Sequence, residues 1–165
     1  MSPGSAAIDA FLDREAAVAA VTRYATALDA RDWRTYRALF TDAVAIDYSA
    51  IGSLVATVSA DEWTNRCRTL EGFDATAHQL HNVIATIDGD HAMVTSIVDA
   101  VHVVGVEDRA LLGDLIGRYT HRLVRQDEWK IAGVTLTVVA YPAGKEAFEA
   151  AFAAARAIFA EGHSA

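Results

Sequence analysis

The sequence is poor in cysteine and in positive charge, and it has no long apolar run. Its single cysteine, Cys67, excludes an intrachain disulfide and a cluster of thiolate metal ligands. The 14 Lys and Arg residues are outnumbered by 22 Asp and Glu residues, which gives a formal net charge of −8. Without a basic stripe to displace counterions from phosphates, nucleic-acid partners and anionic membrane surfaces are disfavoured. No apolar stretch reaches the ~18–20 residues that a membrane-spanning helix needs.

The sequence also lacks the motifs of common cofactor chemistry. It has no Gly-rich phosphate loop, no Gly-x-Ser-x-Gly elbow and no dinucleotide-binding fingerprint. Its first residues lack the basic and apolar regions of a signal peptide. We therefore expect a soluble, cytoplasmic protein that uses no cofactor.

The first third of the chain has the periodicity of helices. Apolar residues recur at three- and four-residue steps and predict an amphipathic helix over residues 7–29. Asp32 is placed as the N-cap of a second, short helix that reaches Phe40. The run Ser59-Ala-Asp-Glu62 has the spacing of a capping box and predicts a third helix over residues 60–70.

The second half changes to the two-residue alternation of β-strands. Turn sequences at Asp88-Gly89-Asp90 and Gln126-Asp127-Glu128 each predict an antiparallel hairpin. The segment 105–113 is expected to be a loop, and an Ala-rich helix is expected from Gly144 onward. Strands are predicted over residues 44–48, 54–58, 77–87, 91–104, 114–126 and 129–140.

Together these elements predict one α+β domain over residues 1–165. A hydrophobic content of 53% with 22% charged residues is ordinary for a globular protein and too apolar for disorder. Helices followed by an antiparallel meander indicate helices packed on one face of a sheet. A curved sheet covered in this way leaves a concave side, where a small-molecule pocket is expected.

The stretch Ala77–Ile84 puts two histidines and an asparagine into an otherwise apolar run. Strand alternation predicts that His78 and Asn82 share one face and that His81 lies on the other. The two histidines would then not converge on a common point, so we predict no metal site.

Other polar and aromatic side chains are candidates for the pocket or for the core. His102 shares a strand face with small apolar residues, which fits either a pocket residue or a core histidine bonded to a backbone carbonyl. Asp99 falls on the opposite face of the strand and is interpreted as structural. The alternation of its strand does not decide whether His121 faces the pocket, so its role stays open. The tryptophans have the spacing of packing residues, and Trp63 is also a candidate to contact a substrate.

Four short motifs lie along the first half of the chain: Tyr24-x4-Asp29, Asp32-Trp33, Asp47-Tyr48 and His78-x3-Asn82. Together they resemble the SnoaL-like group of the nuclear transport factor 2-like superfamily, over about residues 8–140. That group includes scytalone dehydratase, bile-acid 7α-dehydratase and hexachlorocyclohexane dehydrochlorinase. The resemblance implies a cone-shaped barrel, in which a strongly curved, mostly antiparallel sheet is wrapped by N-terminal helices, with an additional C-terminal helix. It also implies a homo-oligomer, a dimer or trimer, because members commonly pair through the outer face of the sheet.

The resemblance further implies roles for individual side chains. In these lyases an aspartate of the first helix orients a strand histidine, and the matching residues here are Asp29 and His78. Tyr24 and Tyr48 match tyrosines of the dehydratases, whose hydroxyl groups can hydrogen-bond a developing enolate or a departing hydroxyl. His102 falls close to the second histidine of scytalone dehydratase. The expected site therefore consists of Asp29, His78, Tyr24, Tyr48, His102, Asn82 and Trp63.

The function implied is cofactor-independent β-elimination, most simply dehydration, of a small hydrophobic carbonyl compound, aromatic or polycyclic. A histidine that titrates near ~6.5 exchanges protons readily at neutral pH. Two alternatives remain open. One is an isomerase or polyketide cyclase that abstracts a proton next to a carbonyl, with Asp47 and Asp99 as candidate carboxylates. The other is a ligand-binding module without catalysis.

Overall fold

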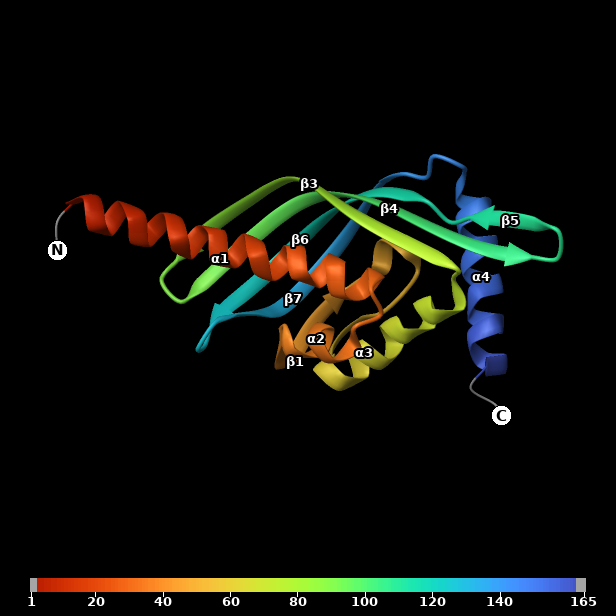
Figure 1. The fold of residues 1–165 in the computed structure, drawn as a ribbon, viewed down its shortest axis with the longest axis horizontal. Helices are drawn as coiled ribbons and strands as arrows, with labels where there is room; N and C mark the ends of the chain where they lie inside the picture. The colour runs from red at the N-terminus through yellow and green to blue at the C-terminus, as the bar shows by residue number, and fades with distance from the viewer. Residues whose placement is uncertain (1–2, 163–165) are drawn as a thin grey trace.

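A computed structural model describes residues 3–162 and shows helices packed along one side of a curved sheet (Figure 1). The helices are α1 (Pro3–Asp29), α2 (Trp33–Ala38), α3 (Ala60–Cys67) and α4 (Lys145–Gly162), with short 3-10 helices at Ser49–Ile51 (η1) and Arg68–Gly72 (η2).

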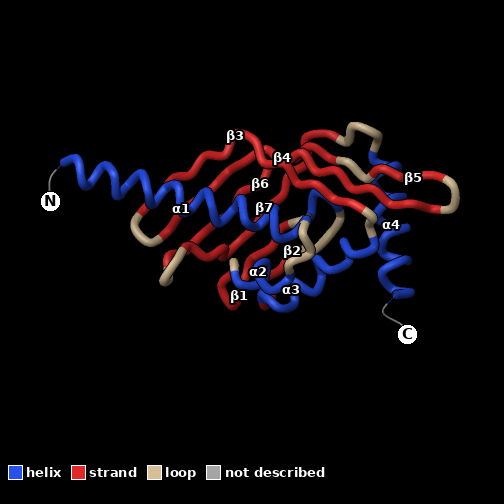
Figure 2. Tube along the Cα trace, viewed as in Figure 1, coloured by secondary structure: helices blue, strands red, loops and turns tan. Residues whose placement is uncertain are grey.

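Seven strands form the sheet, in the order β2-β1-β7-β6-β4-β3, and β5 extends it beside β4 (Figure 2). Only β1 and β7 pair in parallel; every other neighbouring pair described is antiparallel. The predicted α+β fold with a curved, mostly antiparallel sheet is therefore confirmed. The strands are β1 (Phe40–Asp47), β2 (Val55–Ser59), β3 (Ala75–Asp88), β4 (His91–Val106), β5 (Arg109–Leu112), β6 (Leu115–Arg125) and β7 (Trp129–Ala140).

Helix α1 lies along the sheet and supplies one wall of the core. Small residues such as Ala17 and Ala20 are buried where the helix meets the sheet, because they allow close approach. The helix begins four residues earlier than predicted, and its N-terminal end extends beyond the strands (Figure 1). Phe11 and Leu12 remain exposed.

The two predicted N-caps are present. The Asp32 carboxylate accepts a hydrogen bond from the backbone N–H of Thr35 at 3.0 Å, and the Ser59 hydroxyl accepts one from Glu62 N–H at 3.1 Å. Each bond satisfies an N–H group that has no partner within its own helix. The helices end earlier than predicted, because β1 already begins at Phe40 and η2 replaces the last turn of α3.

Helix α4 closes one end of the barrel by packing against η2 and the β4–β5 hairpin. Gly72 makes this possible, since a Cβ atom there would overlap the carbonyl oxygen of Ala155. A Cβ at Gly113 would likewise lie 3.0 Å from the Ala151 side chain. The predicted loop at 105–113 is wrong in part, because Arg109–Leu112 pairs with β4 as β5 and so gives α4 a wider platform.

Strand β3 departs from simple alternation. Its pairing with β4 shifts register between His81 and Ile84, and Asn82 takes a left-handed backbone conformation with φ of 50°. This β-bulge moves Val83 and Ala85 toward the core and turns Ile84 outward. Everything beyond the bulge therefore faces the side opposite to the one that strict alternation predicts.

Candidate active site

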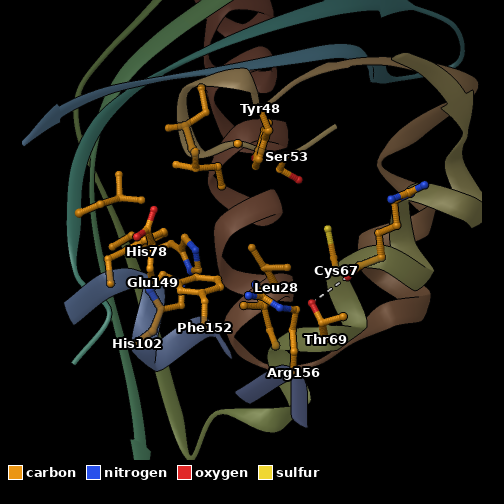
Figure 3. Close-up of a pocket in the computed structure, with 18 of the residues that line it drawn as sticks. Leu28, Tyr48, Ser53, Cys67, Thr69, His78, His102, Glu149, Phe152 and Arg156 are labelled. Atoms are coloured by element: carbon orange, nitrogen blue, oxygen red, sulfur yellow. Dashed lines mark hydrogen bonds between the residues drawn. The ribbon is translucent and has the colours of Figure 1, made fainter. Parts of the chain in front are cut away.

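The concave side of the sheet holds a cavity of about 790 Å³. Its lining residues come from strands β3, β4, β6 and β7, from helices α1, α3 and α4, and from η1 and η2; Figure 3 shows several of them around the cavity. Within residues 3–162, no helix is long and apolar enough to cross a membrane.

Asp29 and His78 meet at one side of this cavity. Asp29 is the last residue of α1, and His78 lies near the start of β3, which packs against α1. The Asp29 Oδ1 atom lies 2.7 Å from His78 Nδ1. Because a carboxylate accepts, this bond places the ring proton on Nδ1 in the neutral ring and leaves Nε2 for a substrate.

Two further donors fix the Asp29 carboxylate. The backbone N–H of His78 donates to Oδ2 at 2.7 Å, and the Thr76 hydroxyl donates to Oδ1 at 2.9 Å. Burial by itself raises the pKa of Asp29, but hydrogen bonds and charge from His78, together with Thr76, outweigh burial and lower it. Asp29 is therefore an anion at neutral pH, and its carboxylate contacts the ring nitrogen Nδ1 of His78.

The Arg31 side chain connects the three chain segments that surround Asp29. It has a left-handed backbone with φ of 57°, which ends α1 and directs its guanidinium back toward β3. The guanidinium donates to the Thr76 hydroxyl at 2.6 Å and to the Leu70 carbonyl at 2.9 Å. It also donates to the Asp29 carbonyl at 3.1 Å, so one side chain joins the end of α1 to both η2 and β3.

Tyrosines form a second polar group in the cavity. The hydroxyls of Tyr24 and Tyr48 lie 2.8 Å apart, and both residues line the cavity. Burial, the largest cause, raises the pKa of each well above 10, so both stay protonated at neutral pH. They cannot act as bases there. Each hydroxyl can serve as the donor or as the acceptor of the bond between them.

His102 lies beside the Asp29–His78 pair, referred to below as the dyad, but it has a different hydrogen-bond partner. Its ring centroid is 5.0 Å from that of His78, and its Nδ1 donates to the Gly113 carbonyl at 2.6 Å. Burial, followed by the neighbouring His78, lowers the pKa of His102 to about 3. Both interpretations of this residue apply, because it is a carbonyl-bonded buried histidine that also lines the cavity.

Of the two remaining predicted site residues, one lines the cavity and the other does not. Trp63 lines the cavity, and its indole N–H donates to the Tyr36 hydroxyl at 3.1 Å. Asn82 does not line the cavity: the prediction that it shares the face of His78 is wrong, because Asn82 is itself the bulge residue and its side chain is exposed.

Several buried residues around the cavity were not singled out for chemistry by the sequence. Tyr119 lines the cavity, and its alternation with His121 was the only available signal. His121 is fully buried beneath Tyr24, with a pKa lowered by burial to about 3 and no hydrogen-bond partner for either ring nitrogen within residues 3–162. The thiol of Cys67 lines the cavity too, but burial raises its pKa to about 12, which argues against a nucleophile.

The alternative acid and metal chemistries find little support in the described part of the chain. Asp47 is partly buried and accepts hydrogen bonds from Ser49, and Asp99 faces outward on β4. Neither lines the cavity, so neither is placed as a carboxylate base. Among residues 3–162, no three His, Cys, Asp or Glu side chains are grouped to hold a metal ion.

Comparison with known proteins places the chain among similar folds. The family model described as a SnoaL-like domain matches residues 9–135. The Kfla4162 protein from Kribbella flavida shares 26% identity with a TM-score of 0.76, covering 85% of this chain and 99% of its own. No curated protein matches the sequence.

Two structures from Novosphingobium aromaticivorans are also similar. One is provisionally assigned as a scytalone dehydratase, at 25% identity and a TM-score of 0.67, covering 76% of this chain and 83% of its own. The other is provisionally assigned as an aromatic ring hydroxylase, at 26% identity and a TM-score of 0.68, covering 79% of this chain and 91% of its own. Similar folds therefore carry different assigned activities, and the site must decide between them.

Proposed function

The chain belongs to the SnoaL-like domain family, and on that basis we propose that it is a cofactor-independent lyase that dehydrates a small hydrophobic carbonyl compound. The observation that carries this proposal is the 2.7 Å contact between Asp29 and His78 at the edge of the cavity. The similarity to a structure provisionally assigned as a scytalone dehydratase supports the same reaction class.

In the first step His78 removes a proton. Its Nε2 accepts the proton from the carbon next to the substrate carbonyl, and the electron pair of that C–H bond moves into the enolate. Asp29 stabilises the imidazolium that results, because its carboxylate contacts Nδ1. Thr76 keeps that carboxylate in place while the charge develops.

In the second step the hydroxyl on the β-carbon departs. The enolate pair forms the C=C bond as the C–O bond breaks, and the leaving hydroxide takes the proton from the His78 imidazolium to become water. Tyr48, backed by Tyr24, donates to the enolate oxygen while it carries charge. The ring of His78 is then neutral again, and no other reactant is consumed.

The test is a reaction with β-hydroxy ketones in D₂O, with scytalone included, followed by NMR and by absorbance of the conjugated product. Loss of water with the wild-type protein, abolished in His78→Ala, supports the lyase. The matched control is His81→Ala, because His81 is exposed on the same strand. Exchange of deuterium without loss of water would instead indicate an isomerase or cyclase, and neither reaction across the panel would indicate a ligand-binding module.

We also propose that the protein forms a homo-oligomer through the outer face of β3 and β4. Ile84 is 62% exposed and Met93 is 47% exposed, and the two are diagonal neighbours across these strands. A second copy seated on this face would remove both apolar side chains from water. Light scattering of Ile84→Lys, compared with the wild type, is expected to show a smaller particle, and an unchanged mass would contradict the proposal.

A further inference from the structure

The mouth of the cavity has a charge opposite to that of the whole protein. The chain has a formal net charge of −8, yet the charged residues lining the cavity around its opening are two arginines and one glutamate. Arg66 comes from α3, whereas Glu149 and Arg156 come from α4. Figure 3 shows the Arg156 side chain extending from α4 toward the space between Phe152 and Thr69.

The ion pairs around the opening leave one of these charges uncompensated. The Lys145 Nζ atom lies 3.3 Å from Glu149 Oε1, and an Arg66 guanidinium nitrogen lies 3.3 Å from Glu62 Oε1, so both side chains have an ion-pair partner. Within residues 3–162, Arg156 makes no ion pair with a carboxylate. A cation that borders a cavity and lacks a protein partner is available to an anionic ligand.

The interior of the cavity differs from its mouth. Beyond the dyad, its walls are the aromatic and aliphatic side chains of residues such as Tyr119, Leu115, Leu136 and Phe152. These surfaces favour an apolar ring system. A ligand that fills the interior and reaches the opening would therefore be apolar at one end and anionic at the other.

We infer that the substrate carries an oxyanion, a carboxylate or a phosphate, at the end that lies between Arg156 and Arg66. This inference rests on the proposed function, since it assigns the substrate class of the same cavity. Arg156 makes the larger contribution because Glu62 already compensates Arg66 in part. The reacting carbonyl end of the substrate then lies inward, toward His78.

Binding of matched naphthalenes tests the inference without turnover. Calorimetry would compare 2-naphthoate with the neutral 2-naphthamide, which has the same ring. We expect the wild type to bind the anion about fivefold more tightly, the size of an exposed charge pair. This preference should disappear in Arg156→Gln, shrink in Arg66→Gln, and persist in the control Arg14→Gln, whose exposed arginine lies on α1 and does not line the cavity.

Two further binding measurements characterise the anion subsite: one varies the ionic strength, and the other uses a phosphate ester. The preference should also fall at ~1 M ionic strength, where the screening length is ~3 Å. A third ligand, 2-naphthyl phosphate, separates the sources: tighter binding than naphthoate indicates a phosphate ester, and weaker binding indicates a free carboxylic acid.

Other outcomes would overturn the inference. These are equal binding of 2-naphthoate and 2-naphthamide, no binding of either, or an anion preference that survives in Arg156→Gln. The readout is independent of the dyad, so the two proposals fail separately. A lost anion preference with His78-dependent turnover rejects the anion subsite alone, whereas a retained preference without turnover rejects the lyase alone.

Discussion

His78 and His102 lie ring to ring on neighbouring strands, with their centroids 5.0 Å apart, but they contact different partners. His78 bonds the carboxylate of Asp29, whereas His102 bonds the neutral carbonyl of Gly113. A carboxylate stabilises an imidazolium, and a carbonyl does so much less. Burial accordingly lowers the pKa of His102 to about 3 and keeps it neutral. Two histidines in one cavity thus differ in their electrostatic surroundings, because the ring of His78 contacts an anion and the ring of His102 contacts a neutral carbonyl.

Removing each histidine in turn gives the largest expected contrast. We expect His78→Ala to lower kcat by roughly 10²–10⁴-fold, the usual contribution of a general base. His102→Gln keeps a side chain that can hydrogen-bond and is expected to change kcat by about tenfold at most. Steady-state kinetics would check this with whichever β-hydroxy ketone proves to be a substrate. Equal losses of kcat in the two variants would show that His78 and His102 do not differ in role.

Changing the partner of His78 is the next largest effect. Asp29→Asn preserves size but removes the charge that stabilises the imidazolium, so we expect kcat to fall about 100-fold. Circular dichroism and thermal unfolding would show whether the fold is retained. Activity within twofold of wild type, in a folded variant, would mean that the Asp29–His78 bond is structural.

A smaller effect is expected one bond further away. Thr76→Val removes the hydroxyl that donates to Asp29 at 2.9 Å and accepts from Arg31 at 2.6 Å. We expect kcat to fall about tenfold with KM unchanged, because Thr76 acts through Asp29 and does not line the main cavity. Thr76→Ser should restore the rate. A change in KM instead, or failure of the serine variant to restore kcat, would argue against a positioning role.

The smallest effect concerns the buried His121, which has no carboxylate partner. Its pKa is about 3 in the folded protein, against ~6.5 for an unfolded chain. Below pH ~6.5 the unfolded state binds the extra proton, so the free energy of unfolding falls as the pH falls toward 3, by up to ~1.4 kcal/mol per pH unit. His121→Phe should remove the contribution of His121 to this slope, while that of His102, whose pKa is also about 3, remains. The substitution should also stabilise the fold by about 1 kcal/mol at neutral pH, since two unpaired nitrogens leave the core.

Urea unfolding of both proteins between pH 7 and pH 5 would measure this slope. Curves that stay parallel over that range would show that His121 is protonated to the same extent in the folded and unfolded states.

Much of the fold was predictable because local signals agree with the final structure. The helix periodicity of α1, the caps at Asp32 and Ser59, and the hairpin turn at Gly89 each act over a few residues. The strand β5 was missed because its pairing with β4 follows a short, polar turn without strong alternation. The close contact of Gly72 with α4 depends on residues more than 80 positions apart, which no local pattern reveals.

The candidate site was predictable only in part. The resemblance selected Asp29 and His78, and the structure brings them together. The alternation of strand residues gave the wrong face for Asn82. One residue in a left-handed conformation reverses the facing of every later side chain in the strand. Asparagine tolerates that conformation better than most residues, which was the one available hint. The roles of Arg31 and Thr76 could not be predicted, since both arise from contacts between α1, η2 and β3.

The most direct test of the central claim is the protonation pattern of the His78 ring, read by ¹⁵N NMR of histidine side chains at neutral and higher pH. We predict that the neutral ring carries its proton on Nδ1, hydrogen-bonded to Asp29, and that Nε2 is unprotonated and shifts when a ligand binds. In Asp29→Asn this preference should weaken. A neutral His78 with its proton on Nε2 would contradict the account, because the atom facing the substrate could not then accept a proton.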